Sequence, residues 1–340
     1  MIQFRFGCRK ITLLSLYLSI LSSVVCAIVA NFATLLLARA LIGFAIGLNF
    51  SIHNVMIGKL ASNKANLDEI LMISTPMYSL GGVWSAVLGY LLLEVMGWRT
   101  FVLVTSLPVF IPPIAMLHCY LQDESEPEIK DEREEIIPNE TQTTVPNYVA
   151  RVTKIGMFTG TCAFTGLMTI LLVPSLIQLL KIKESGTNTD CSVTVTQGAE
   201  FLLLGLVTSA SVPGRVFIHF VRKKISFRKR QVLVSLVKVG CFVWMLLQEN
   251  LAVAVTTNFI VMFLFGATAM ESAYIVYDKS YFGTTGFALG CSIATAGGKM
   301  GSVGGLALVA FVPPFYAMIC AAVISAIQIP VVFSMTEVQI

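Results

Sequence analysis

Long stretches without a charged residue alternate with short polar segments along almost the whole chain. Between Lys10 and Arg39 there is no charged residue, whereas a helix that crosses the hydrocarbon core of a bilayer needs only about 20 apolar residues. Comparable uncharged stretches run from Ile70 to Leu93 and from Ile155 to Leu180. The pattern therefore predicts membrane-spanning helices.

Ten spanning helices are expected along the chain. Helices are favoured over barrel strands because a spanning backbone must satisfy its own hydrogen bonds, and these runs are too long and too little alternating for strands of about 10 residues. Pro313-Pro314 divides the last uncharged stretch, which predicts a hairpin between two helices. The predicted fold class is an all-α, multi-pass membrane helical bundle. The expected spans are 11–29, 33–56, 69–93, 99–119, 155–179, 199–220, 231–248, 252–276, 285–309 and 315–335.

An acidic, proline-containing stretch divides these helices into four before it and six after it. Its acidic residues precede Pro138 and Pro146 and show no apolar periodicity, so a solvated connector that only tethers its neighbours is expected. The expected domains are an incomplete N-terminal helical half at 1–121, the linker at 122–154 and a six-helix half at 155–340.

Composition and charge agree with a membrane protein. Hydrophobic residues make up 56% of the chain and charged residues 12%, and the mean hydropathy is +0.82, which leaves too little polar surface for a soluble domain. Most of the 23 Lys and Arg residues fall in cytoplasmic segments if both termini are cytoplasmic. The lipid bilayer is the expected partner, at the plasma membrane or an intracellular vesicle membrane. No nucleic-acid partner is expected, since the basic cluster 222–230 lies between two spans and favours anionic headgroups.

Motifs for catalysis or metal binding are missing from the sequence. The eight cysteines are scattered and form no Cys-x-x-Cys pair, so neither a zinc site nor a disulfide framework is indicated. There is no P-loop, no pair of catalytic carboxylates and no Ser/His/Asp set. We therefore expect no enzyme activity, cofactor or metal.

An internal repeat relates the two halves. Phe6-Gly-Cys-Arg-Lys10 and Ile225-Ser-Phe-Arg-Lys229 are basic turns that each lead into four helices in the same orientation. Two helices, between Thr153 and Lys224, precede the second turn, whereas only five residues precede the first. This comparison predicts that two helices are missing from the first half.

Several motifs resemble the major facilitator superfamily of secondary transporters, whose plan is six plus six helices with a long central loop. The segment Arg39-x-x-x-Gly43-x-x-x-Gly47 is similar to that superfamily's fourth-helix motif. Gly97-Trp-Arg99, Ala273-Tyr-Ile-Val-Tyr277 and Gly286-Phe-Ala-Leu-Gly290 are similar to the branch of the organic-ion transporters and the synaptic vesicle glycoprotein 2 relatives. The resemblance implies two pseudo-symmetric helical halves with a solute bound near the midplane between them.

The chain also departs from the family pattern. His219 stands near the place of an aspartate expected before the second basic turn. Met56-Ile-Gly-Lys-Leu60 lacks an expected glutamate, and Lys279-Ser280 replaces the family's Pro-Glu. Because those charges belong to the family's cytoplasmic gate, the departures allow a relative that does not transport.

The predicted span at 285–309 carries the strongest candidates for solute contact. Ser292, Thr295 and Lys299 form one polar stripe at helical spacing. A stripe of small residues that includes Gly297 and Gly301 lies on roughly the opposite side. Such a helix packs tightly on one side and lines a cavity on the other, although a lysine that bonds to a neighbouring helix explains the same pattern.

Four further candidates are ionisable or polar groups in other spans. As part of the family motif, Arg39 could meet an anionic substrate or modulate a proton site, or it could snorkel or bond to a carbonyl. Asn54, with its neighbour His53, could add donors to a cavity, or His53 could be a satisfied core residue. Glu271 shares a helical face with Tyr274, and an ion pair between Glu271 and Lys238 is one hypothesis. The other is that these two charges reach the interface separately.

The sequence therefore predicts a carrier that moves a small organic solute, charged or neutral, by alternating access, with a coupling ion as an optional further partner. The alternatives are a transport-incompetent relative that acts as a membrane interaction protein and a truncated partial gene product.

Overall fold

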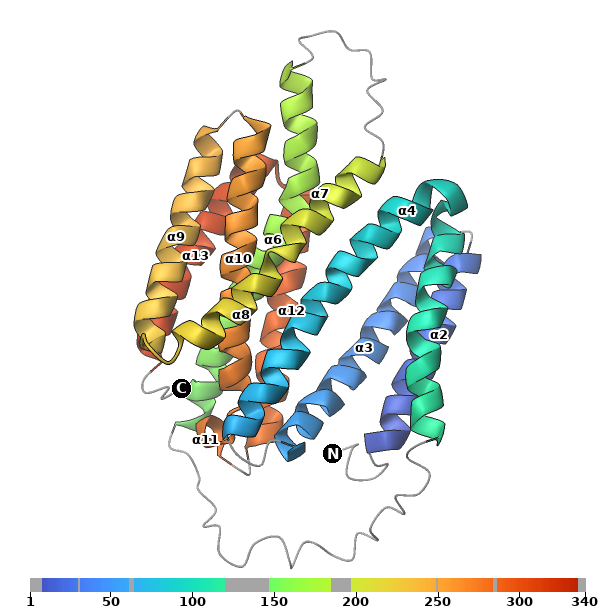
Figure 1. Cartoon of the computed structure of the whole chain (residues 1–340), viewed down its shortest axis with the longest axis horizontal. Coiled ribbons are helices and arrows are strands. Elements are labelled where there is room, and N and C mark those ends of the chain that lie inside the picture. Colours follow the sequence, from blue (N-terminus) through green and yellow to red (C-terminus); the bar gives the residue numbers. More distant parts are fainter. Residues whose placement is uncertain are drawn as a thin grey trace, which may run out of the picture. The chain divides into compact units, whose positions relative to one another are not determined.

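A computed structural model describes residues 8–29, 31–60, 64–119, 147–184, 197–248, 250–283 and 286–335. Every element in these ranges is a helix (Figure 1). Ten segments of this described part are long and apolar enough to cross a membrane, which confirms the predicted all-α, multi-pass fold. The helices are α2 (Cys8–Ile28), α3 (Phe32–Leu60), α4 (Lys64–Cys119), α6 (Tyr148–Glu184), α7 (Gln197–Ser209), α8 (Ser211–Val221), α9 (Phe227–Leu247), α10 (Leu251–Val276), α11 (Lys279–Phe282), α12 (Phe287–Phe311) and α13 (Pro314–Ser334).

Helix α4 contains two spans that meet at Gly97. This glycine has φ 70° and ψ 158°, a conformation essentially restricted to glycine because a Cβ would clash with the backbone. The two candidate spans of α4 are Asn66–Leu93 and Val95–Met116, and Gly97 lies at the start of the second. Both predicted helices are therefore present, and Gly97 joins them without a longer loop.

The single span predicted at 199–220 is interrupted in its middle. Helix α7 ends at Ser209, α8 begins at Ser211, and Ala210 forms a turn between them. Pro213 explains the break, because proline has no backbone N–H and its ring clashes with the carbonyl four residues earlier. The two helices still form one continuous apolar segment, Phe201–Val221.

Helix α6 begins at Tyr148, earlier than the predicted 155. Three polar side chains in its first two turns hold it in place. The hydroxyl of Tyr148 donates to the carbonyl of Gly286 at 2.7 Å, Arg151 donates to the carbonyl of Tyr281 at 3.2 Å, and Lys154 donates to the carbonyl of Ser334. The end of the predicted linker is thus helical, and its residues 122–146 lie outside the described residues.

The chain forms two compact units. The first comprises the described residues of Met1–Met56 and Leu91–Thr143, and the second those of Ile57–Tyr90 and Thr144–Ile340. Within the first unit, the Tyr17 hydroxyl lies 3.0 Å from Nε2 of His118, and Arg99 donates to the carbonyl of Val29 at 3.2 Å. These bonds connect α2 to the last span of α4.

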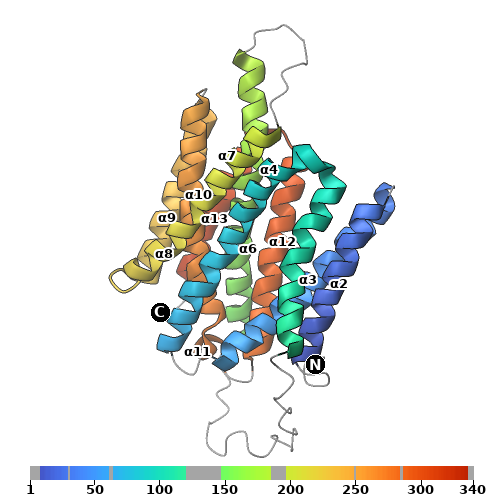
Figure 2. The ribbon, with the colours of Figure 1, turned by 45° about the vertical axis from the view of Figure 1, so that its right-hand side comes forward.

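In the second unit, α6 packs against α10, α12 and α13, while α9 packs against α13 and α8 against α10 (Figures 1 and 2). One apolar cluster includes Phe227 of α9 and Val332 of α13. This cluster lies beside the turn Arg222–Ser226, which directly precedes Phe227. We call this end of the second unit the basic-turn end. A second cluster includes Phe242 and Ala321 of the same two helices, so the core is apolar toward both ends.

Helices α6 and α12 approach each other so closely that their backbones touch. A Cβ at Gly297 would lie 2.5 Å from the carbonyl oxygen of Gly156, and one at Gly301 would clash with the carbonyl of Gly160. In the same contact, the hydroxyl of Thr159 donates to the carbonyl of Ala294 at 2.7 Å. The small-residue stripe of α12 therefore lies against α6, as small residues allow in membranes.

Candidate functional site

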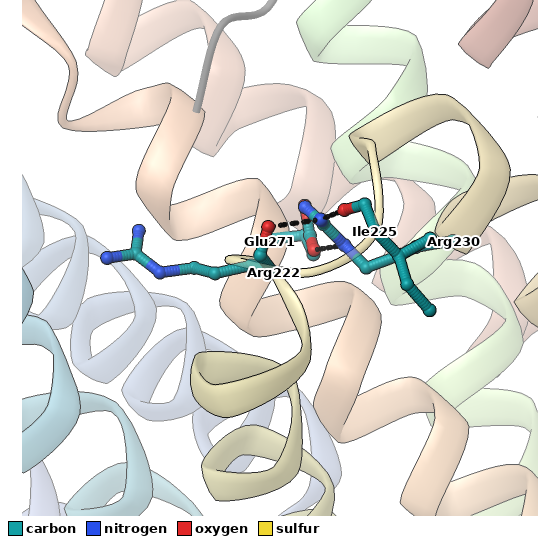
Figure 3. A network of polar contacts seen from close by, with 4 residues as sticks. All are labelled: Arg222, Ile225, Arg230 and Glu271. Carbon is teal, nitrogen blue, oxygen red and sulfur yellow. Dashed lines mark hydrogen bonds and ion pairs between the residues drawn. The ribbon is translucent and has the colours of Figure 1, made fainter.

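The basic-turn end of the second unit contains a buried ion pair. Arg230, in the first turn of α9, donates from Nε to Oε1 of Glu271 at 2.6 Å, and their side chains are 3% and 0% exposed (Figure 3). Its Nη1 donates to the carbonyls of Arg222, at 2.9 Å, and Ile225. Carbonyls at the end of a helix have no partner inside the helix, so Arg230 closes the end of α8 while it neutralises Glu271 on α10.

Arg222 points away from that pair, as Figure 3 shows. Its Nη2 forms an ion pair with Oδ2 of Asp68 in the first turns of α4, and its guanidinium carbon lies 3.9 Å from the centre of the Tyr274 ring. The Tyr274 hydroxyl is 2.9 Å from Nδ1 of His219. Glu271 and Tyr274, about one turn apart on α10, therefore belong to one polar network that joins α4, α8, α9 and α10.

The hypothesis of an ion pair between Glu271 and Lys238 is wrong, since Glu271 pairs with Arg230. Lys238 instead donates from Nζ to Oγ1 of Thr268 at 3.0 Å. The reason is the start of α9, at Phe227 rather than at the predicted 231. At 1.5 Å per residue, Lys238 then lies about 17 Å along α9 and Glu271 only about 8 Å from its end of α10.

The sequence contained a signal for the correct partner. Arg230 is the fourth residue of α9, so it enters the unit at nearly the depth of Glu271. A buried carboxylate needs a cation at its own depth, and with the correct helix start this rule selects Arg230. The ion pair between Arg222 and Asp68 could not be predicted from a local pattern, because the two residues are 154 positions apart.

Helix α12 presents its polar stripe on the side away from α6. Ser292 and Lys299 are exposed, and Thr295 is partly buried. The hydroxyls bond to their own helix, from Ser292 to the carbonyl of Ala288 and from Thr295 to that of Cys291, both at 2.8 Å. Lys299 lies near the centre of the span Phe287–Phe311. The structure thus brings these three predicted residues onto one face.

The four candidates on α3, Arg39, Gly43, Gly47 and Asn54, all lie in the first unit. Arg39 is exposed, and apart from the nearby backbone of α3 no described atom lies within 4 Å of a Cβ built at Gly43 or Gly47. Asn54 is on α3, but its side chain lies outside the described residues. The predicted roles of these four residues stay predictions.

Tyr281 belongs to the short helix α11, outside the membrane spans, and packs against the first turns of α6. The guanidinium carbon of Arg151 lies 5.6 Å from the centre of its ring, and burial raises the pKa of Tyr281 to about 12. The phenol therefore stays neutral at physiological pH and holds α11 against α6 without exchanging a proton. Within the described ranges, no group of three or more His, Cys, Asp or Glu side chains could hold a metal ion.

Comparison with known protein families gives a match. The chain matches the family model of the Major Facilitator Superfamily over residues 3–306. That range includes all described helices from α2 to α11 and most of α12. No curated protein matches the chain.

Proposed function

Because the chain belongs to the Major Facilitator Superfamily, we propose that it is a secondary carrier that moves a small organic solute, charged or neutral, across a membrane by alternating access. Family membership and the ten apolar segments of the described residues support a membrane transporter. The identity of the solute, a place in the organic-ion transporter branch and a coupling ion are further parts of this proposal.

The exposure of Lys299 is the observation that carries the proposal. A lysine at the centre of a lipid-facing span costs about 2.5 to 3.5 kcal/mol on insertion scales. Lys299 is exposed near the middle of its span, and Ser292 is exposed two turns away on the same side. A path filled with water or solute along this face of α12 removes that cost.

The opposite face of α12 is fixed to α6 by backbone contacts at Gly297 and Gly301. A helix with one rigidly packed side and one polar side can line a solute path, because its polar groups keep their positions while the path opens and closes. We propose Ser292, Thr295 and Lys299 as the solute-facing residues of this wall. Arg39 and Asn54 of the first unit, and Glu271 and Tyr274 of the second, are proposed as separate candidates for contact with the solute.

We assign a gating role to the pair of Asp68 and Arg222. Asp68 precedes the acidic linker in sequence and Arg222 follows it, and their side chains are 25% and 9% exposed. An ion pair that water can reach is worth about 1 kcal/mol or less, so it can break and reform during a transport cycle. By the positive-inside rule, this end of the unit faces the cytoplasm. Such a contact favours a transporter over a transport-incompetent relative.

Uptake into liposomes tests the function directly. The purified chain is reconstituted and offered a panel of radiolabelled organic anions, organic cations and neutral solutes. We expect saturable uptake of at least one class, reduced about tenfold or more in Lys299→Met. Lys224→Met, in the exposed basic turn, is the matched control and keeps full uptake.

A folded protein that takes up none of the panel saturably, and whose melting temperature no solute changes, would reject transport. The same result would favour the interaction-protein alternative.

A further inference from the structure

A layer of buried polar side chains crosses the interface between α9 and α13. Gln231, Ser235 and Lys238 of α9 are each 0% exposed, and so are Ser325 and Gln328 of α13. We call these five residues the polar layer. None of them belongs to the network at the basic-turn end or to the polar face of α12.

The polar layer lies between the two apolar clusters of the second unit. Phe227 of α9 and Val332 of α13 share the cluster at the basic-turn end, whereas Phe242 and Ala321 share the other. The two helices run antiparallel and lie side by side (Figures 1 and 2). Gln231, Ser235 and Lys238 follow 4, 3 spacing on α9, and Ser325 and Gln328 lie three positions apart on α13, so each set shares one helical face between the two apolar clusters.

Most polar atoms of this layer lack a partner. The amide nitrogen and oxygen of Gln231 and of Gln328 form no hydrogen bond with the described residues. The hydroxyls of Ser235 and Ser325 form none either. Each unsatisfied buried polar group costs about 1 to 3 kcal/mol, and native proteins keep few of them. Four such side chains in one layer indicate that a polar species lies between them.

The charge of Lys238 decides which species fits. Its ammonium donates to Thr268 at 3.0 Å, and no carboxylate within the described part of the chain forms an ion pair with it. Glu271, about one turn from Thr268, is bound to Arg230. A fully buried ammonium without a counter-ion is costly.

We propose that the polar layer binds a small inorganic anion, such as chloride, between α9, α10 and α13. The ammonium of Lys238, the amide groups of Gln231 and Gln328, and the hydroxyls of Ser235 and Ser325 can all donate to an anion. Water satisfies the amides and hydroxyls but leaves the charge of Lys238 uncompensated, and the cations Lys238 and Arg230 repel a metal ion. This site lies inside one helical unit and does not depend on transport of a solute.

The test compares anions at constant ionic strength. Melting temperatures of the purified full chain in detergent are measured while sodium chloride replaces sodium gluconate. We expect chloride to raise the melting temperature saturably, and Lys238→Met to abolish this response or weaken the apparent affinity about tenfold or more. Lys224→Met, on the exposed turn, keeps the wild-type response and controls for loss of a positive charge.

Gln328→Leu provides a second variant if Lys238→Met does not fold, and it is expected to weaken the chloride response as well. Equal melting temperatures in chloride and gluconate would show that only water occupies the layer, or that Lys238 is neutral, and would overturn the proposal. A chloride response that Lys238→Met retains, or that Gln328→Leu retains where the lysine variant does not fold, would overturn it too. Uptake of solute is not measured, so these outcomes leave the transport proposal untouched.

Discussion

Arg230 binds Glu271 through a 2.6 Å contact between Nε and Oε1 that is almost completely shielded from solvent. The same guanidinium bonds to the carbonyl of Arg222 at the end of α8 and to that of Ile225 in the following turn. One side chain therefore holds α8, α9 and α10 together at the basic-turn end. The nearby pair of Asp68 and Arg222 is more exposed, so the two ion pairs should differ in their contributions to stability.

Glu271→Gln should lower the free energy of unfolding by about 3 to 5 kcal/mol, because it leaves a buried guanidinium without a counter-ion. Asp68→Asn is the matched control and should cost about 1 kcal/mol or less, since water screens a partly exposed pair. Denaturant unfolding of the purified protein in detergent measures both changes. Equal effects of the two substitutions would contradict the assignment of Glu271 and Arg230 as the buried structural pair.

Gly301→Ala should destabilise the protein by about 1 to 3 kcal/mol, because the new methyl group must push α12 away from the backbone of α6 at Gly160. Gly298→Ala on the same helix is the control. Its Cβ would lie 3.8 Å from Cβ of Thr159, which is ordinary contact, so its stability should be unchanged or slightly raised. Thermal unfolding compares the two variants, and similar melting temperatures would argue against backbone contact at Gly301.

The packed side of α12 could be derived from the sequence because small residues at helical spacing identify a close helix contact without knowledge of the partner. The partner of Glu271 could not, since choosing between Arg230 and Lys238 needs the first residue of α9, and propensities do not fix helix starts so closely. The contact of Arg222 with Asp68 depends on tertiary packing across 154 positions. Local patterns carry no signal for such a pair.

Gly97→Ala should cost about 1 to 3 kcal/mol, because φ 70° with ψ 158° is a strained conformation for any residue with a Cβ. Gly81→Ala serves as the control, since it lies within a helical stretch and no described atom approaches its Cβ position within 4 Å. That substitution should be neutral or stabilising by up to about 1 kcal/mol. Melting temperatures in detergent separate the two outcomes, and a tolerated Gly97→Ala would refute the tight junction between the two spans of α4.

Tyr274→Phe should lower stability by about 1 kcal/mol, because it removes the hydroxyl that bonds to His219 and keeps the ring beneath Arg222. Tyr274→Leu should cost a further 0.5 to 2 kcal/mol, roughly the value of a cation–π contact. The difference between the two variants is measured by chemical unfolding with Arg222 present and with Arg222→Met, and the part that is lost with the guanidinium isolates the contact with Arg222. The same difference in both backgrounds would show that the ring does not stabilise the guanidinium.

Access of water to position 299 is the most direct test of the central claim, that α12 presents Lys299 to a solute path. Lys299→Cys and Ile293→Cys are made in a chain whose eight native cysteines are replaced, and Ile293 is an exposed apolar residue on another side of the same helix. Both are treated in liposomes with a charged, membrane-impermeant thiol reagent. Rapid labelling at position 299 and little at 293 is the predicted result. Equally slow labelling at both positions would show that Lys299 faces lipid or protein and would contradict the account.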